Sequence, residues 1–171
     1  MSNLDALRPT FVTGLRNAHA VENQALALID RQLERLENYP ALSERLTLHR
    51  TETENQIGRL EEILSSLAES HSSLKDMALS LSGNMAALGH TIAGDEVLKN
   101  SFANLAFENF ECASYISLIT LAEMGGFNSA VPLLQTSLSE EEAMATFVRE
   151  AIPDTTERFV RLASAGAQAS R

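Results

Sequence analysis

The stretch Phe107-Glu-Asn-Phe-Glu-Cys-Ala-Ser-Tyr115 decides the fold of this chain, because it places acidic side chains inside an apolar helix. Glu108, Glu111 and Tyr115 are spaced three and four apart, so on an α-helix they share one face. The surrounding run over residues 98–124 is apolar for most of its length. A carboxylate buried there is unfavourable unless it is paired, protonated or bound to a metal ion. The other helices therefore have to supply a partner.

The pattern of the whole chain predicts an all-α fold. Apolar side chains recur at helical spacing, and the Gly, Pro and Asn clusters of strand-rich folds are scarce. We expect four long helices over residues 10–38, 41–69, 95–124 and 127–152, and a shorter crossover or lateral helix over 74–92. Pro40 makes the first connection short, which favours antiparallel neighbours.

Pro153 is expected to end the last bundle helix, and a further amphipathic helix can form over residues 154–162. The domain prediction is therefore a flexible leader over residues 1–9, a helical bundle over 10–152, and a C-terminal helix and loose tail over 153–171.

Charge and composition exclude several classes of protein. The net charge of −10 argues against nucleic acid as the main partner and is compatible with attracting cations. The single cysteine, Cys112, excludes an internal disulfide framework and suits a reducing compartment. The N-terminus lacks the pattern of a signal peptide, and no apolar run approaches the length of a membrane span. We expect a cytoplasmic protein with neither a nucleic-acid nor a membrane partner.

Each of the four long helices carries an acidic residue at or near its apolar seam. The candidate metal ligands are Glu22, His49, Glu52, Glu108, Glu111 and Glu141. Five carboxylates and one imidazole form the oxygen-rich set expected of a carboxylate-bridged pair of iron or manganese ions. Two cations would offset the repulsion between carboxylates that would otherwise take up protons. We therefore expect two metal ions as partners, iron in the first place and manganese as the alternative.

Each candidate also has an ordinary structural interpretation. A glutamate on a helix seam is often paired with arginine, and Arg45 and Arg59 could neutralise part of the cluster. His49 by itself is more often a hydrogen-bonded core histidine. Glu140 and Glu142 flank the seam and are expected to reach solvent. The metal hypothesis depends on the coincidence of acids across four helices, because the seams carry few basic residues to match them.

The order and spacing of these motifs resemble the ferritin-like stress-protein family typified by YciF and YciE. The matching pieces are Ala20-Val-Glu22-Asn-Gln24, residues 49–60, residues 108–115 and Leu138-Ser-Glu140-Glu141. The resemblance covers about residues 10–150. It implies a ferritin-like antiparallel four-helix bundle with one or two accessory helices, often a homodimer, with a dinuclear metal site inside the bundle.

Carried over by position, the ligands of that family fall on the six candidates named above. Several members of the family have an acid where this chain has Ala145, so an acidic neighbour of the site is missing here. The site could therefore hold metal weakly, hold one ion, or be degenerate.

Three functions follow. The first is a protein with a dinuclear iron or manganese site that serves in stress, peroxide or iron handling, with catalysis left open. The second is a non-catalytic, dimeric helical interaction protein with a degenerate metal site. The third is an iron-storage subunit. Stoichiometric metal with a distinct spectrum separates the first from the second.

Overall fold

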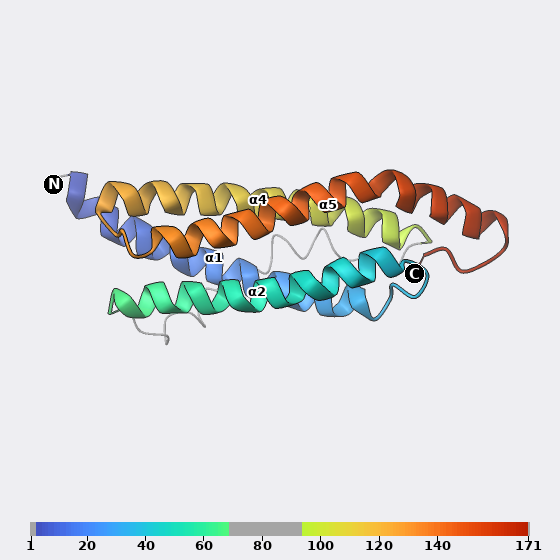
Figure 1. The fold of residues 1–171 in the computed structure, drawn as a ribbon, viewed down its shortest axis with the longest axis horizontal. Helices are drawn as coiled ribbons and strands as arrows, with labels where there is room; N and C mark the ends of the chain where they lie inside the picture. The colour runs from blue at the N-terminus through green and yellow to red at the C-terminus, as the bar shows by residue number, and fades with distance from the viewer. Residues whose placement is uncertain (1–2, 69–93, 171) are drawn as a thin grey trace.

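The computed structural model describes residues 3–68 and 94–170. These residues form four α-helices, α1 (Asn3–Leu33), α2 (Pro40–Ser66), α4 (Glu96–Gly125) and α5 (Val131–Ser164), and no strand (Figure 1). The predicted all-α fold is therefore confirmed. The lateral helix predicted over residues 74–92 lies outside the described residues.

The four helices lie side by side in an elongated bundle (Figure 1). The closely packed pairs are α1 with α2, α1 with α4, α2 with α5, and α4 with α5. Packed neighbours run antiparallel, whereas α2 and α4 run in the same direction at opposite corners (Figure 1). The short connections over residues 34–39 and 126–130 each join antiparallel neighbours, as short loops require. The described part of the chain contains no helix with an apolar stretch long enough to cross a bilayer.

Two prolines that lie next to predicted helix boundaries are inside helices. Pro9 is within α1, which begins at Asn3, and α5 continues through Pro153. A proline inside a helix removes one backbone hydrogen bond and crowds the carbonyl four residues earlier. Both prolines are exposed, so water can satisfy the freed carbonyl groups. The predicted break at Pro153 is therefore wrong, and the separate helix predicted over residues 154–162 is the last part of α5.

The residues after α5 fold back onto the connection between α1 and α2. The Tyr39 hydroxyl donates a hydrogen bond to the carbonyl oxygen of Ala169 at 2.5 Å. The Asn38 side-chain amide donates to the carbonyl oxygen of Gln168 at 2.9 Å. The prediction of a loose tail is therefore wrong for this segment, because tertiary hydrogen bonds hold it.

The two larger apolar clusters of the described residues lie inside the bundle. The first includes Phe11, Leu15, Leu60, Leu118 and Leu134. The second includes Ile29, Leu46, Val97, Met144 and Val148. On every helix, the buried acids or histidine fall between the residues that belong to the two clusters. The fold therefore places the candidate site in a polar layer with apolar packing on both sides.

Candidate metal centre

The candidate centre is a layer of polar side chains contributed by all four helices. Its most deeply buried members, each no more than 5% exposed, are Glu22, His49, Gln56, Glu108, Glu111, Tyr115 and Glu141. Glu108, Glu111 and Tyr115 lie on the inward face of α4, as their spacing predicted. The layer therefore contains five of the six predicted ligands, and the sixth, Glu52, lies at its edge.

The closest group of potential ligands consists of His49, Glu108 and Glu141. The His49 Nε2 atom lies 3.2 Å from Oε2 of Glu108 and 3.8 Å from Oε2 of Glu141. One ligand atom from each of these residues lies within 4.8 Å of the other two. One imidazole nitrogen and two carboxylate oxygens are a suitable donor set for a divalent iron or manganese ion.

Glu52 holds His49 in its orientation from the outer side. Its Oε2 accepts hydrogen bonds from His49 Nδ1 at 2.9 Å and from Arg45 at 2.9 Å. Burial works against the charged form, but these two hydrogen bonds outweigh it and lower the pKa of Glu52. Because Nδ1 donates to Glu52, Nε2 is the ring nitrogen that faces the other carboxylates. Histidines that bind metal through one ring nitrogen commonly donate the other N–H to a carboxylate in this way. The ligand role of Glu52 itself stays a prediction.

Glu22 and Glu111 extend the layer. The Tyr115 hydroxyl donates a hydrogen bond to Oε1 of Glu22 at 2.6 Å, while Oε2 of Glu22 and both oxygens of Glu111 are buried without a hydrogen-bond partner. Burial raises the pKa of Glu22 to about 7. Burial, followed by the nearby charges of Glu22 and Glu141, raises the pKa of Glu111 well above its usual range. Both carboxyls therefore lie where the ionised form is strongly disfavoured without a cation.

Gln56 is a member of the layer that the sequence analysis did not assign. Its Nε2 donates to Oε1 of Glu141 at 2.5 Å and to Oε2 of Glu140 at 3.0 Å. Arg59 donates to the same oxygen of Glu140. The available signal was a polar residue within the apolar stripe of its helix, and Gln56 is fully buried. Glu140 was expected to reach solvent, but its side chain is only 22% exposed and pairs with Arg59.

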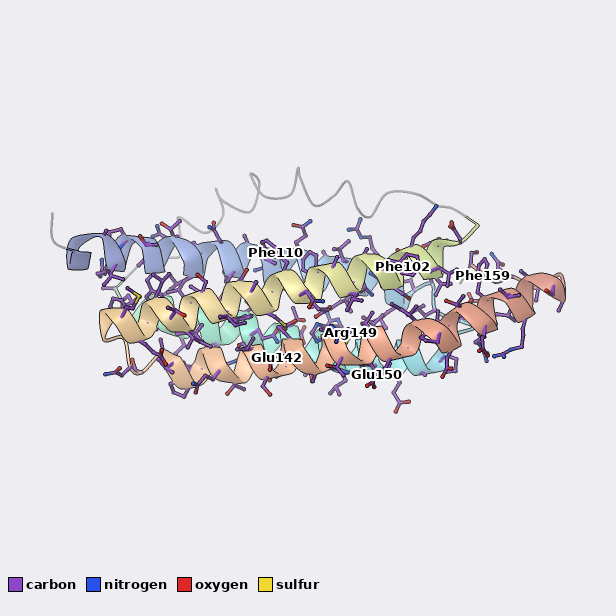
Figure 2. The ribbon with its side chains drawn as sticks, turned by 90° about the horizontal axis from the view of Figure 1, so that it is seen from above. Phe102, Phe110, Glu142, Arg149, Glu150 and Phe159 are labelled. Carbon is purple, nitrogen blue, oxygen red and sulfur yellow. The ribbon has the colours of Figure 1, made fainter. Side chains whose placement is uncertain are left out.

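Two further predictions concern α5. Glu142 is exposed, as expected (Figure 2). Ala145 lies on the core side one turn after Glu141 and is 5% exposed, so an acid at this position would face the interior.

The charges of the layer are unbalanced. Among the described residues, His49 is the one basic side chain within ion-pair distance of Glu108 and Glu141. Burial by itself lowers the pKa of His49, but the nearby carboxylates of Glu108 and Glu52 raise it to about 9. Burial, followed by the nearby carboxylate of Glu108, raises the pKa of Glu141 to about 12. One imidazolium cannot neutralise four buried carboxylates, so the layer needs either protons or metal cations.

Unpartnered oxygens provide a direct test of whether this donor set fits a metal. The buried side-chain oxygens without a hydrogen-bond partner are Oε2 of Glu22, Oε1 of Gln56, Oε2 of Glu108, both oxygens of Glu111, and Oε2 of Glu141. Leaving a buried acceptor unsatisfied costs about 1–3 kcal/mol, and more when the group is charged. Cations coordinated by these oxygens would remove that cost, so the donor set fits a metal centre.

Comparison with known proteins identifies the family. A family model described as a domain of unknown function, DUF892, matches residues 6–161. This chain belongs to the DUF892 family. Among similar proteins, protein YciF of Escherichia coli strain K12 is 30% identical to this chain over 149 residues, which cover 82% of this chain and 87% of YciF. The resemblance to the YciF family that the motifs indicated is confirmed.

Solved structures with the same fold include relatives of similar length. A protein of Xanthomonas campestris pv. campestris aligns with a TM-score of 0.77 at 25% identity, covering 92% of this chain and 99% of its own. The crystal structure of YciF, described as a stress protein of E. coli, aligns with a TM-score of 0.68 at 24% identity, covering 90% and 97%. The similarity therefore extends over the whole bundle.

Proposed function

We propose that this protein binds two iron ions, or alternatively two manganese ions, in the buried carboxylate layer, and that it handles iron or peroxide during stress. One observation carries the proposal. Four buried glutamates, Glu22, Glu108, Glu111 and Glu141, present oxygens without hydrogen-bond partners, and His49 lies within ion-pair distance of two of them, Glu108 and Glu141. Such an arrangement is expensive for a merely structural core, where apolar residues of similar size are usually as stable or more stable.

The residues that would hold the metal are these four glutamates together with His49. Carboxylate oxygens with one imidazole nitrogen match the preferences of iron and manganese. Glu52 would act on the metal through His49, because it accepts the Nδ1 proton and leaves Nε2 as a donor. Tyr115 would hold one oxygen of Glu22, leaving the other for a cation. A bound pair of iron ions would supply electron transfer to oxygen or peroxide.

The stress role is supported by similarity to YciF of E. coli, which is described as a stress protein. We place the protein in the cytoplasm, where a reducing environment suits its single cysteine.

The test is metal analysis of protein purified without chelator, followed by anaerobic titration with Fe²⁺ and an absorbance scan after air is admitted. We expect about two ions per chain, as dinuclear carboxylate bundles hold, and a charge-transfer band after oxidation. Glu141→Ala should lose metal, whereas Glu142→Ala, which changes the exposed neighbour on the same helix, should keep it. A wild-type protein that neither contains metal nor binds it on titration would rule the proposal out.

A second candidate, a dimeric interaction protein, is favoured by the outer face of α4. The apolar side chains of this face that are about half exposed are Phe102, Phe110, Ile116 and Met124, of which Figure 2 labels the two phenylalanines. Between Lys99 and Glu123 the helix carries only two charged residues, Glu108 and Glu111, and both are buried. A long uncharged helix face is typical of an interaction surface. A second copy of the chain is the proposed occupant, and sedimentation of the wild-type protein tests it: a monomer at micromolar concentration would contradict this candidate.

A further inference from the structure

A cation that reaches the carboxylate layer has to leave water and pass between the helices, because the ligands are almost fully buried. Two partly exposed carboxylates lead inward from the surface. They are Glu52 and Glu140, whose side chains are 20% and 22% exposed. Each is paired with an arginine of α2, Glu52 with Arg45 and Glu140 with Arg59.

The path that begins at Glu52 ends at a hydrogen-bond donor. The Oε2 atom of Glu52 accepts from both Arg45 and His49 Nδ1. The next group inward is therefore an imidazole N–H, which offers no lone pair to a cation.

The path that begins at Glu140 leads past Gln56, whose amide carries an oxygen acceptor as well as the donating nitrogen. Gln56 donates from a single nitrogen to Oε2 of Glu140 at 3.0 Å and to Oε1 of Glu141 at 2.5 Å. The remaining oxygens of Gln56 and Glu141, Oε1 and Oε2 respectively, are buried and have no hydrogen-bond partner. Exposure falls along this series from 22% for the Glu140 side chain to 0% for Gln56 and Glu141. Iron(II) and manganese(II) accept oxygen ligands readily, so the series suits the stepwise replacement of their water.

Building on the proposed function, we propose that cations enter the centre along Glu140, Gln56 and Glu141, and that Arg59 closes the outer end of this route. Arg59 donates to Oε2 of Glu140 and, from Nε, to the Ser137 hydroxyl at 3.0 Å. A divalent cation that arrives at Glu140 competes with the guanidinium for the carboxylate. Arg59 can then keep its hydrogen bond to Ser137 while it releases Glu140. The net charge of −10 raises the local concentration of cations around the chain.

The test measures the rate of Co²⁺ uptake separately from final occupancy, by mixing chelator-treated protein with Co²⁺ and following the visible absorbance of the bound ion. Glu140→Gln keeps an acceptor for Gln56 and Arg59 but removes the charge at the entrance. It should slow uptake on the order of tenfold and leave the final occupancy unchanged. Arg59→Met removes the positive charge at the entrance and should speed uptake about threefold or more. Glu142→Gln removes one negative charge from the exposed neighbour and should match the wild type.

Other results would contradict either the route or the role of Arg59. If Glu140→Gln takes up Co²⁺ as fast as Glu142→Gln, the route is wrong. If Glu140→Gln loses occupancy without a change in rate, Glu140 only supports Glu141 and the route is again wrong. If Arg59→Met slows uptake, Arg59 does not close the entrance. A wild-type protein that takes up no Co²⁺ overturns the proposed function as well, which distinguishes the two failures.

Discussion

Glu111 offers the sharpest test of the buried layer, because its substitution should stabilise the metal-free protein. Glu111 is 2% exposed, and neither of its oxygens has a hydrogen-bond partner. Its pKa is raised well above the ordinary value of 4.5, first by burial and then by the charges of Glu22 and Glu141. The folded protein therefore favours the protonated form of this carboxyl more than the unfolded chain does, and full protonation at neutral pH sets the upper limit of the effect.

The size of the effect follows from this proton. Protonating a carboxyl with an ordinary pKa of 4.5 costs about 3 kcal/mol at pH 7 and about 0.7 kcal/mol at pH 5. Glu111→Gln removes this cost and keeps the shape of the side chain. The amide also leaves about as many unpartnered polar atoms as the protonated acid, so the penalty for those atoms largely cancels. The variant should therefore be more stable than the wild type by up to about 3 kcal/mol at pH 7, which corresponds to about 6–12 °C in Tm for a chain of this size.

The assay is urea unfolding followed by far-ultraviolet circular dichroism, on chelator-treated protein at pH 5 and pH 7. We expect a clear gain in the unfolding midpoint for Glu111→Gln at pH 7, a much smaller gain at pH 5, and a loss of metal capacity in the untreated protein. Glu150→Gln, an exposed position on α5, is the control and should leave the midpoint unchanged at both pH values (Figure 2). A variant that is no more stable than the wild type at pH 7, or equally stabilised at both pH values, would refute the reasoning.

Three further predictions test the site and the fold. Glu22→Ala and Glu141→Ala should each lower metal content at least about tenfold while the helical circular dichroism is kept, and full metal in both would refute the site. Folding raises the pKa of Glu22 from 4.5 to about 7 and that of His49 from 6.5 to about 9. A group whose pKa is higher in the folded state stabilises the fold at pH values below its unfolded-state pKa, and this stabilisation disappears as the pH rises through its folded-state pKa. The urea midpoint of the metal-free protein should therefore fall from pH 5 to pH 9, and a rising midpoint would contradict this. Pro153→Ala should stabilise a continuous α5 by about 1–3 kcal/mol in thermal unfolding, and no gain would argue for a helix that ends there.

The candidate ligands could be chosen from the sequence because helical periodicity is a local property. A period of 3.6 residues decides which side chains share a face, and apolar neighbours decide which face is buried. Glu108, Glu111 and Tyr115 were placed on one inward face for this reason, and the structure buries all three. Glu142 was placed outside by the same argument and is exposed, whereas Glu140, also placed outside, is only 22% exposed.

The prolines were misread because a local rule was applied without its tertiary context. Pro9 and Pro153 would break helices whose freed carbonyls had no other partner. Both prolines face solvent, so water can bond the carbonyl groups that they leave free. The sequence alone does not show which side of the last part of α5 faces solvent.

The sequence by itself determined that this is an antiparallel helical bundle with acids on its inner seams and no matching set of buried bases. The tertiary structure alone decided which polar groups meet across the helices. It placed Glu52 behind His49, joined Gln56 to Glu140 and Glu141, and paired Arg59 with Glu140. The reason is physical: the face of a helix depends on residues three and four apart, whereas contacts between helices depend on their axial register and crossing, which the packing of the whole core determines.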